Sequence, residues 1–331
     1  MSTQEIQTVT PESDFEAPQP EIALLPCPDP GLHVGVPEDE YRRWNAANAS
    51  SLKILGAKSP KHCDYQRRHP KEPTPALIMG TAIHLLALEG EEKYAAKYRI
   101  IGGCSATKKS GQPCSNGAKV IRDGQPFCGV HDPAKELPFD GMIWNSGQDE
   151  ITRAVVKSIR DSEIGSNFLD SDPEALNEVA MVWDDATTGQ RCKAKIDALR
   201  PTWKRIGDLK SCLDANPLEF QTTIGGREYD LQAMFYLQGS LRCYQQCGDT
   251  RIKDLEGFTF LCVEKAPPYA ASFCDWLPGD QEAGPIQNEI QRCLRIWKHC
   301  TETGRWYGYA DELRQIRIPQ WRLKKLIDRG G

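Results

Sequence analysis

The order of apolar and polar residues along the chain predicts strands enclosed by helices. Apolar residues recur with the period of a β-strand, or run together, at 178–183, 191–199, 205–211, 257–264 and 271–276. Polar residues 184–190 make the first two strands a hairpin. Helical periodicity predicts helices at 76–88, 149–162, 229–245 and 285–301. We therefore expect a mixed α/β core.

The N-terminal part of the chain has a different character. Residues 1–30 are rich in Pro, Glu, Gln and Ser, which predicts a disordered tail, and order is expected to begin near Tyr41. Ser50 or Ser51 can cap a helix that continues through Leu55, and Ser59-Pro60 starts another. The predicted division is a tail at 1–30 and one domain at 31–331, with an insert at 101–135.

Composition limits the class of protein. No apolar run is long enough to span a bilayer, and the N-terminus lacks the pattern of a secretory signal, so we expect a cytoplasmic protein without a membrane partner. In that setting the 13 cysteines should be thiols or metal ligands rather than disulfides. The net charge of -5 argues mildly against a nucleic-acid partner, although basic clusters such as 61–71 and 317–329 leave room for one basic face.

Two aspartates and a lysine form the main candidate site. Asp208 and Lys210 are two residues apart on a predicted strand and share a face, and Asp197 lies on the strand before it. Carboxylates held close together repel, and a divalent cation with hard oxygen ligands, Mg²⁺ or Mn²⁺, relieves that repulsion. Such a cation can activate water at a phosphodiester, while a lysine neutralises developing charge. Taken alone, the Asp-x-Lys pattern fits an ordinary surface hairpin better.

Further residues favour the chemical interpretation. His84 lies on a predicted helix one turn after Gly80 and Thr81, which leaves an open surface of small residues beside the imidazole. A single histidine in this setting is more often structural. Glu178 opens the first predicted strand and could supply a further acidic ligand.

The helix at 229–245 has two distinct faces. The stripe expected in the core consists of Leu231, Met234, Phe235 and Leu241. The opposite face consists of Tyr229, Gln232 and Tyr236 and could contact DNA or the site, or be solvated.

A cysteine-rich insert interrupts the apolar pattern between residues 100 and 140. Its candidate ligands follow the spacing C-x9-C-x13-C-x2-H and are Cys104, Cys114, Cys128 and His131. Because the segment has few apolar side chains of its own, a structural Zn²⁺ is the expected source of order, against the alternative of four coincidental loop residues. The insert could contact DNA, a partner or a neighbouring subunit.

Taken together, these motifs resemble the RecB-type branch of the PD-(D/E)XK nucleases, and most closely the phage and prophage exonuclease VIII (RecE-type) group. The resemblance covers about 41–321 apart from the insert. The matching stretches are Ser50-Ser51-Leu52-Lys53, Ser59-Pro60, 80–84, 178–183, 192–197, Asp208-Leu209-Lys210, 229–236, 303–309 and 318–321.

The resemblance implies a restriction-endonuclease-like fold and a role for each matching residue. It implies that His84 and Asp197 are metal ligands and that Asp208 is the central bridging ligand. It implies that Lys210 is the catalytic lysine and that Gln232 and Tyr236 line the site. Glu178 matches an acidic position of less defined role. The zinc-binding insert departs from the usual family pattern.

The resemblance also implies an activity. It is Mg²⁺- or Mn²⁺-dependent hydrolysis of DNA, 5′-to-3′ from duplex ends, which exposes a 3′ single strand for a single-strand annealing protein in phage-type recombination. A ring-shaped homo-oligomer and a phage or prophage origin in a bacterial host are part of this expectation. The alternatives are a RecB-type endonuclease, a single-strand nuclease, and a non-catalytic zinc-bearing DNA-binding module.

Overall fold

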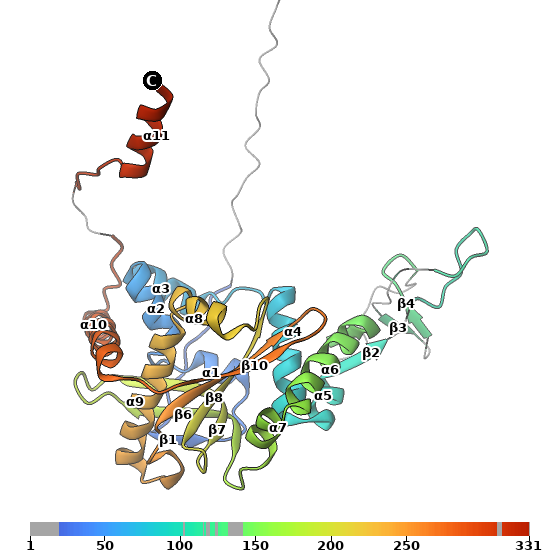
Figure 1. The fold of residues 1–331 in the computed structure, drawn as a ribbon, viewed down its shortest axis with the longest axis horizontal. Helices are drawn as coiled ribbons and strands as arrows, with labels where there is room; N and C mark the ends of the chain where they lie inside the picture. The colour runs from blue at the N-terminus through green and yellow to red at the C-terminus, as the bar shows by residue number, and fades with distance from the viewer. Residues whose placement is uncertain are drawn as a thin grey trace, which may run out of the picture.

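A six-stranded mixed sheet forms the centre of the computed structural model (Figure 1). The strand order is β1 (Gly31–His33), β6 (Leu176–Asp184), β7 (Arg191–Arg200), β8 (Arg205–Cys212), β9 (Gly257–Glu264) and β10 (Ala271–Trp276). Neighbouring strands are antiparallel except β8 and β9, which run parallel. The structure describes residues 20–101, 103–114, 116, 120–122, 125–131, 142–309 and 313–330.

Helices cover both faces of this sheet. One face packs against α2 (Ala49–Ala57), α8 (Pro217–Gly226), α9 (Tyr229–Cys247) and α10 (Asp280–Thr303). The other packs against α4 (Pro75–His84), the π-helix η1 (Leu85–Glu89), α5 (Glu91–Lys97), α6 (Ser146–Asp161) and α7 (Glu163–Asp170). On β9 the neighbours Phe260 and Leu261 belong to the two different cores, as the alternation of a strand requires. The expected α/β class with helices flanking a mixed sheet is confirmed.

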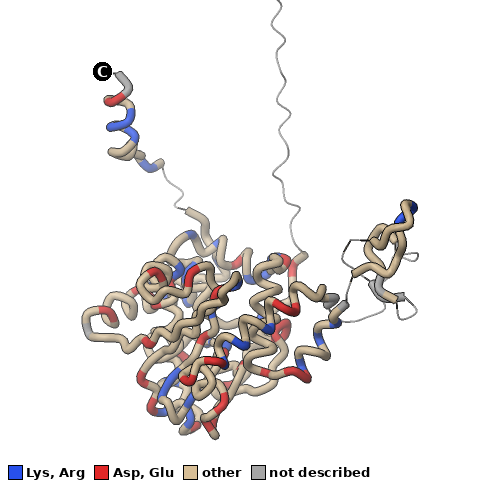
Figure 2. The backbone as a smooth tube through the Cα atoms, turned by 45° about the vertical axis from the view of Figure 1, so that its right-hand side comes forward, with Lys and Arg blue, Asp and Glu red and all other residues tan. Residues whose placement is uncertain are grey.

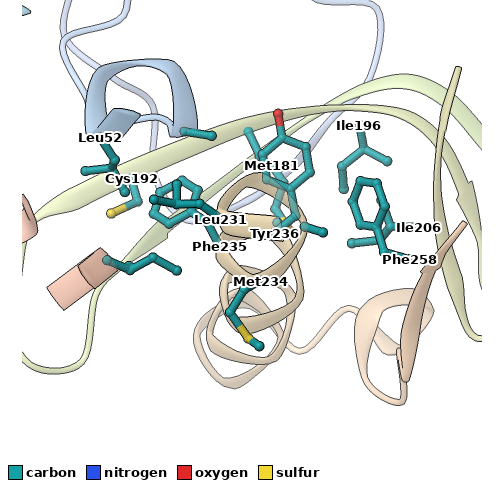
Figure 3. Packing of buried hydrophobic residues seen from close by; sticks show 14 of the residues in the cluster. Leu52, Met181, Cys192, Ile196, Ile206, Leu231, Met234, Phe235, Tyr236 and Phe258 are labelled. Carbon is teal, nitrogen blue, oxygen red and sulfur yellow. The ribbon is translucent and has the colours of Figure 1, made fainter. Parts of the chain in front are cut away.

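Helix α9 supplies many of the buried residues on its face of the sheet. Leu231, Phe235 and Tyr236 extend from it into the layer beneath the strands (Figure 3). Leu241, expected in the same stripe, is instead 51% exposed, so that expectation is wrong. The ring of Trp183 packs against Gly239, which has no side chain to obstruct it. Beyond Gly239, the buried residues of α9 are Ser240 and Cys243. The buried stripe therefore turns away from Leu241.

The cysteine-rich insert leaves the body beside α6 (Figure 1). At its base β2 (Tyr98–Ile101) runs parallel to β5 (Met142–Asn145), and beyond it β3 (Val120–Arg122) pairs with β4 (Gln125–Phe127). Residues 132–141, which hold the expected end of the insert, lie outside the described residues.

The described chain is ordered earlier than the sequence predicts. Ile22 donates a main-chain hydrogen bond to Arg68, in α3 (Pro60–Arg68), and Leu25 donates one to Arg43, in α1 (Glu38–Arg43). Leu25 and Cys27 also pack beside Trp44. The expected beginning of order near Tyr41 is thus too late; residues 1–19 lie outside the described residues.

The C-terminal helix α11 (Gln320–Gly330) stands apart from the body (Figure 1). Figure 2 shows lysine and arginine residues gathered on it, while both signs of charge are mixed over the body. Within the described segments, no helix combines the length and the apolar character needed to cross a membrane.

Candidate active site

Asp197 and Asp208 lie where two neighbouring strands stop pairing. The ladder between β7 and β8 ends at Ala198 and Gly207, and each aspartate is the next residue beyond it. In place of a ladder bond, the main-chain N–H of Leu209 donates to Oδ2 of Asp197 at 2.9 Å. A side-chain oxygen therefore replaces a strand carbonyl, and the two carboxylates face the point where the strands separate.

Glu178 lies on β6, the strand that pairs with β7 on the side away from β8. It lies opposite Asp197, between ladder pairs made by Asn177 and Val179, and makes no ladder pair itself. Its φ of 49° is in the left-handed region, which costs a residue other than glycine on the order of 1–3 kcal/mol and recurs at functional sites. Strand β6 thus bends locally at the residue that turns its carboxylate toward the site.

His84 completes a three-residue cluster from the end of α4. Its Nδ1 lies 3.4 Å from Oδ2 of Asp197 and 3.6 Å from Oε1 of Glu178. Its Nε2 is 2.8 Å from the carbonyl oxygen of Leu209, so Nε2 carries the proton and donates it. Nδ1 faces the two carboxylates, so it can carry a second proton there, or offer its lone pair to a cation once that proton is lost. The three side chains offer ligand atoms within 4.8 Å of one another.

Charge in this cluster is balanced by protons in the metal-free protein. Burial lowers the pKa of His84, but Asp197 and Glu178 outweigh it and raise that pKa to about 9. Burial raises the pKa of Asp197 to about 7, against the influence of His84, and Asp208 adds to the rise. Burial opposes ionisation of Glu178, but His84 and Lys195 hold its pKa below the usual range. His84 and, near neutral pH, part of Asp197 therefore keep their protons where no cation is bound, while Glu178 stays ionised.

Asp208 and Lys210 form an ion pair at the same point of β8. Gln232 on α9 donates from Nε2 to Oδ1 of Asp208 at 3.1 Å, so the expected approach of this helix to the site is observed. The Lys210 ammonium also lies 4.7 Å from the centre of the Tyr229 ring. Burial lowers the pKa of Lys210, but Asp208 and Asp197 outweigh it and raise that pKa. Asp208 is held by its partners rather than being a member of the His84 cluster.

Tyr236 occupies a different place from the one its helical position suggests. It is buried in the core, where its ring packs against Phe258, rather than on an open polar face (Figure 3). Burial raises its pKa well above the usual range, and the charges of Asp208 and Asp197 raise it further. Tyr236 is therefore a core residue, near enough to both aspartates for their charges to raise its pKa, and not a surface residue.

Two further lysines, with no role expected from the sequence, lie beside these residues. Lys195 lies 3.0 Å from Oε2 of Glu38 and 3.6 Å from Oε2 of Glu178. Lys53 donates to the carbonyl of Arg227 at 2.8 Å, and its ammonium lies 5.1 Å from the Tyr229 ring centre. Burial, together with Lys210, lowers the pKa of Lys53 to about 8. Lys53 belongs to the motif Ser50-Ser51-Leu52-Lys53, but its contact with the Tyr229 ring joins residues far apart in the sequence and could not be predicted from that motif.

The four expected zinc ligands converge in the insert. The Sγ atoms of Cys114 and Cys128 are 3.9 Å apart, and Nδ1 of His131 is 3.3 Å from Sγ of Cys128 and 3.6 Å from Sγ of Cys104. Bonds of about 2.3 Å from sulfur to a tetrahedral zinc ion imply sulfur–sulfur separations of roughly 3.7 Å. Burial raises the pKa of the Cys128 thiol, but the N–H groups of Val130 and His131 outweigh this effect and lower that pKa to about 6.

The fold and the family comparison place the protein in the PD-(D/E)XK class of domains. Residues 150–318, just over half of the chain, match the family described as "PDDEXK-like domain of unknown function (DUF3799)", and the chain belongs to this family. The match includes Glu178, Asp197, Asp208 and Lys210; His84 and the insert precede it.

Two further comparisons complete the picture. No curated protein matches the chain. A crystal structure described as a "Putative exonuclease" from Eubacterium rectale is similar, with 12% sequence identity and a TM-score of 0.48 over 88% of this chain and 98% of that chain.

Proposed function

We propose that the protein is a metal-dependent exodeoxyribonuclease of the exonuclease VIII (RecE-type) group. The observation that carries this proposal is the meeting of His84, Glu178 and Asp197 with the Asp208–Lys210 pair where β7 and β8 separate. Such a set, with one neutral nitrogen and several carboxylate oxygens beside a lysine, suits hydrolysis of a phosphodiester.

The donor atoms fit a hard divalent cation, Mg²⁺ or Mn²⁺. Nδ1 of His84 and the carboxylates of Glu178 and Asp197 would hold it, with Asp208 as a bridging ligand. The raised pKa values of His84 and Asp197 support this, because they mark a place where protons stand in for a missing positive charge. The bound cation would supply an activated water and stabilise charge on the phosphate.

The remaining residues would hold the reacting groups in place. Lys210, fixed between Asp208 and the Tyr229 ring, would direct its ammonium at the phosphate oxygens and neutralise the charge that develops on them. Gln232 would keep Asp208 in one orientation through its hydrogen bond to Oδ1. Tyr236, buried in the core near both aspartates, would help to keep them in place.

The direction of digestion and the partners rest on the motif resemblance. We propose 5′-to-3′ digestion from duplex ends, a 3′ single strand passed to an annealing protein, and a homo-oligomer that encloses DNA. With a net charge of -5, enclosure would retain DNA where general attraction to a polyanion is weak. If light scattering finds only monomer in a preparation that digests DNA processively, the proposed homo-oligomer is wrong.

For the insert, we propose a structural Zn²⁺ bound by Cys104, Cys114, Cys128 and His131. The convergence of three thiols and one imidazole at separations that suit a tetrahedral ion supports it. The ion would order a segment that has little apolar core of its own.

The experiment that tests the activity uses two forms of DNA. End-labelled linear duplex and covalently closed circular duplex are incubated with Mg²⁺, each with and without EDTA. An exonuclease shortens the linear form progressively and leaves the circle intact. Cutting of the circle favours a RecB-type endonuclease, preference for single strands favours a single-strand nuclease, and no cleavage of any DNA favours a binding module.

A further inference from the structure

The π-helix that follows His84 is tied to the strand that carries Glu178. In η1 the N–H of Gly90 bonds to the carbonyl of Leu85, which leaves carbonyls of the widened turn for other donors. Arg160 donates to the Ala87 carbonyl at 3.0 Å, and Nδ2 of Asn177 donates to the Leu88 carbonyl at 2.6 Å. Leu88 follows His84 by four residues, so Asn177 anchors the segment immediately beyond the imidazole.

Asn177 and Glu178 are consecutive, yet both reach this helical segment. In a regular strand their side chains would face opposite sides of the sheet. Instead, Asn177 contacts Leu88 while Oε1 of Glu178 lies 3.6 Å from Nδ1 of His84. The left-handed φ of 49° at Glu178 makes this possible. A conformation that is unfavourable in itself persists only when its surroundings hold it.

We propose that Asn177 is a positioning residue that holds Glu178 in its left-handed conformation and keeps its carboxylate beside His84 as a metal ligand. Without the bond to Leu88, β6 can relax to regular geometry at Glu178, which turns the carboxylate away from the cluster. The amide has one available orientation, because turning it over would set Oδ1 against the Leu88 carbonyl. This inference rests on the proposed metal-dependent function and adds a residue to its support.

The direct readout is Mn²⁺ affinity, measured by titration calorimetry on the full chain. Loss of a residue that orients a metal ligand weakens affinity by about 10- to 100-fold. We expect that loss in Asn177→Ala and in Asn177→Asp, which keeps the shape but removes the donor. Ser158→Ala is the matched control, because it removes a 2.6 Å bond from a half-buried side chain to the Tyr269 carbonyl elsewhere in the fold. It should leave Mn²⁺ affinity within about twofold at a similar melting temperature.

A double-mutant cycle separates positioning from general destabilisation. If Asn177 acts through Glu178, then Asn177→Ala combined with Glu178→Gln binds Mn²⁺ as weakly as Glu178→Gln alone. Full additivity of the two losses, or an unchanged affinity in Asn177→Ala, would overturn the inference while leaving the proposed nuclease intact. A wild-type chain that binds no Mn²⁺ and cleaves no DNA would instead overturn both.

Discussion

Asp197 accepts a hydrogen bond from the main-chain N–H of Leu209, across the point where β7 and β8 stop pairing. The main-chain carbonyl of Leu209 accepts a second hydrogen bond, from Nε2 of His84. One peptide segment, flanked by Asp208 and Lys210, therefore fixes an imidazole and a carboxylate from two other elements. Side chains oriented by strand backbone in this way are held more rigidly than side chains on loops.

Removal of the Asp208 carboxylate should abolish turnover. Asp208→Asn removes the ionic partner of Lys210 and the carboxylate that we propose as a bridging ligand of the cation, so the cleavage rate should fall by at least about a hundredfold. The measurement is Mg²⁺-dependent digestion of linear duplex, with exposed Asp254→Asn as the control. Cleavage by wild type that persists in excess EDTA would contradict metal dependence.

Metal affinity should depend on pH. The pKa of Asp197 is raised to about 7 and that of His84 to about 9 in the metal-free protein. Both groups must lose their protons to act as ligands, so each proton competes with the cation. Mn²⁺ affinity should therefore rise as pH increases from about 6 to about 9, and fall as pH decreases through about 7. Calorimetric titrations across this range check it. An affinity that stays constant would show that these groups do not hold the cation.

The insert should contain zinc. Purified protein is expected to hold about one zinc ion per chain, and Cys114→Ser should release it because three ligands remain where four are needed. Elemental analysis gives the content. Cys247→Ser is the control, as this exposed cysteine lies on α9 far from the insert in sequence. A carefully prepared wild-type protein without zinc would refute the proposal.

Helix α9 should not tolerate a side chain at Gly239. A Cβ atom there would lie 2.5 Å from the Trp183 ring, so Gly239→Ala should lower the free energy of unfolding by about 1–3 kcal/mol. Gly225→Ala on α8 meets no atom within 4 Å and should change stability by less than about 1 kcal/mol, toward greater stability. Urea unfolding of both variants is the measurement. Equal stability of both would mean that α9 is packed less closely than described.

The elements that the sequence predicts well are those with long, regular patterns. The strand expected at 205–211 is β8, Arg205–Cys212, and the side-by-side placement of Asp208 and Lys210 follows from the period of that strand. The start of α9 at Tyr229 also follows from periodicity, whereas the place of Gln232 beside Asp208 is implied only by the family resemblance. These features are local, so a single sequence suffices to infer them.

The features that escape sequence reasoning depend on distant contacts. A glutamate gives no signal of a left-handed conformation, and Glu178 adopts one only because of what surrounds it. The bond from Asn177 to Leu88 and the approach of Lys53 to Tyr229 join segments far apart in the chain. Order in residues 20–30 is likewise supplied by other elements, such as Arg68 on α3.

Lys210 offers the most direct test of an enzyme against a binding module. Its ammonium is fixed beside Asp208 and the Tyr229 ring, so Lys210→Ala should leave the fold and the metal ligands in place. The loss of an electrostatic contact made in the transition state lowers the rate far more than the affinity. The matched control is Lys157→Ala, an exposed lysine on α6 that pairs with Asp161.

The measurement is single-turnover cleavage of end-labelled duplex in Mg²⁺, with DNA binding measured in Ca²⁺ on the same preparations. We expect Lys210→Ala to bind duplex ends as wild type does and to cleave about a hundred- to a thousandfold more slowly, with Lys157→Ala unchanged. Equal cleavage rates in wild type and Lys210→Ala would contradict this active site.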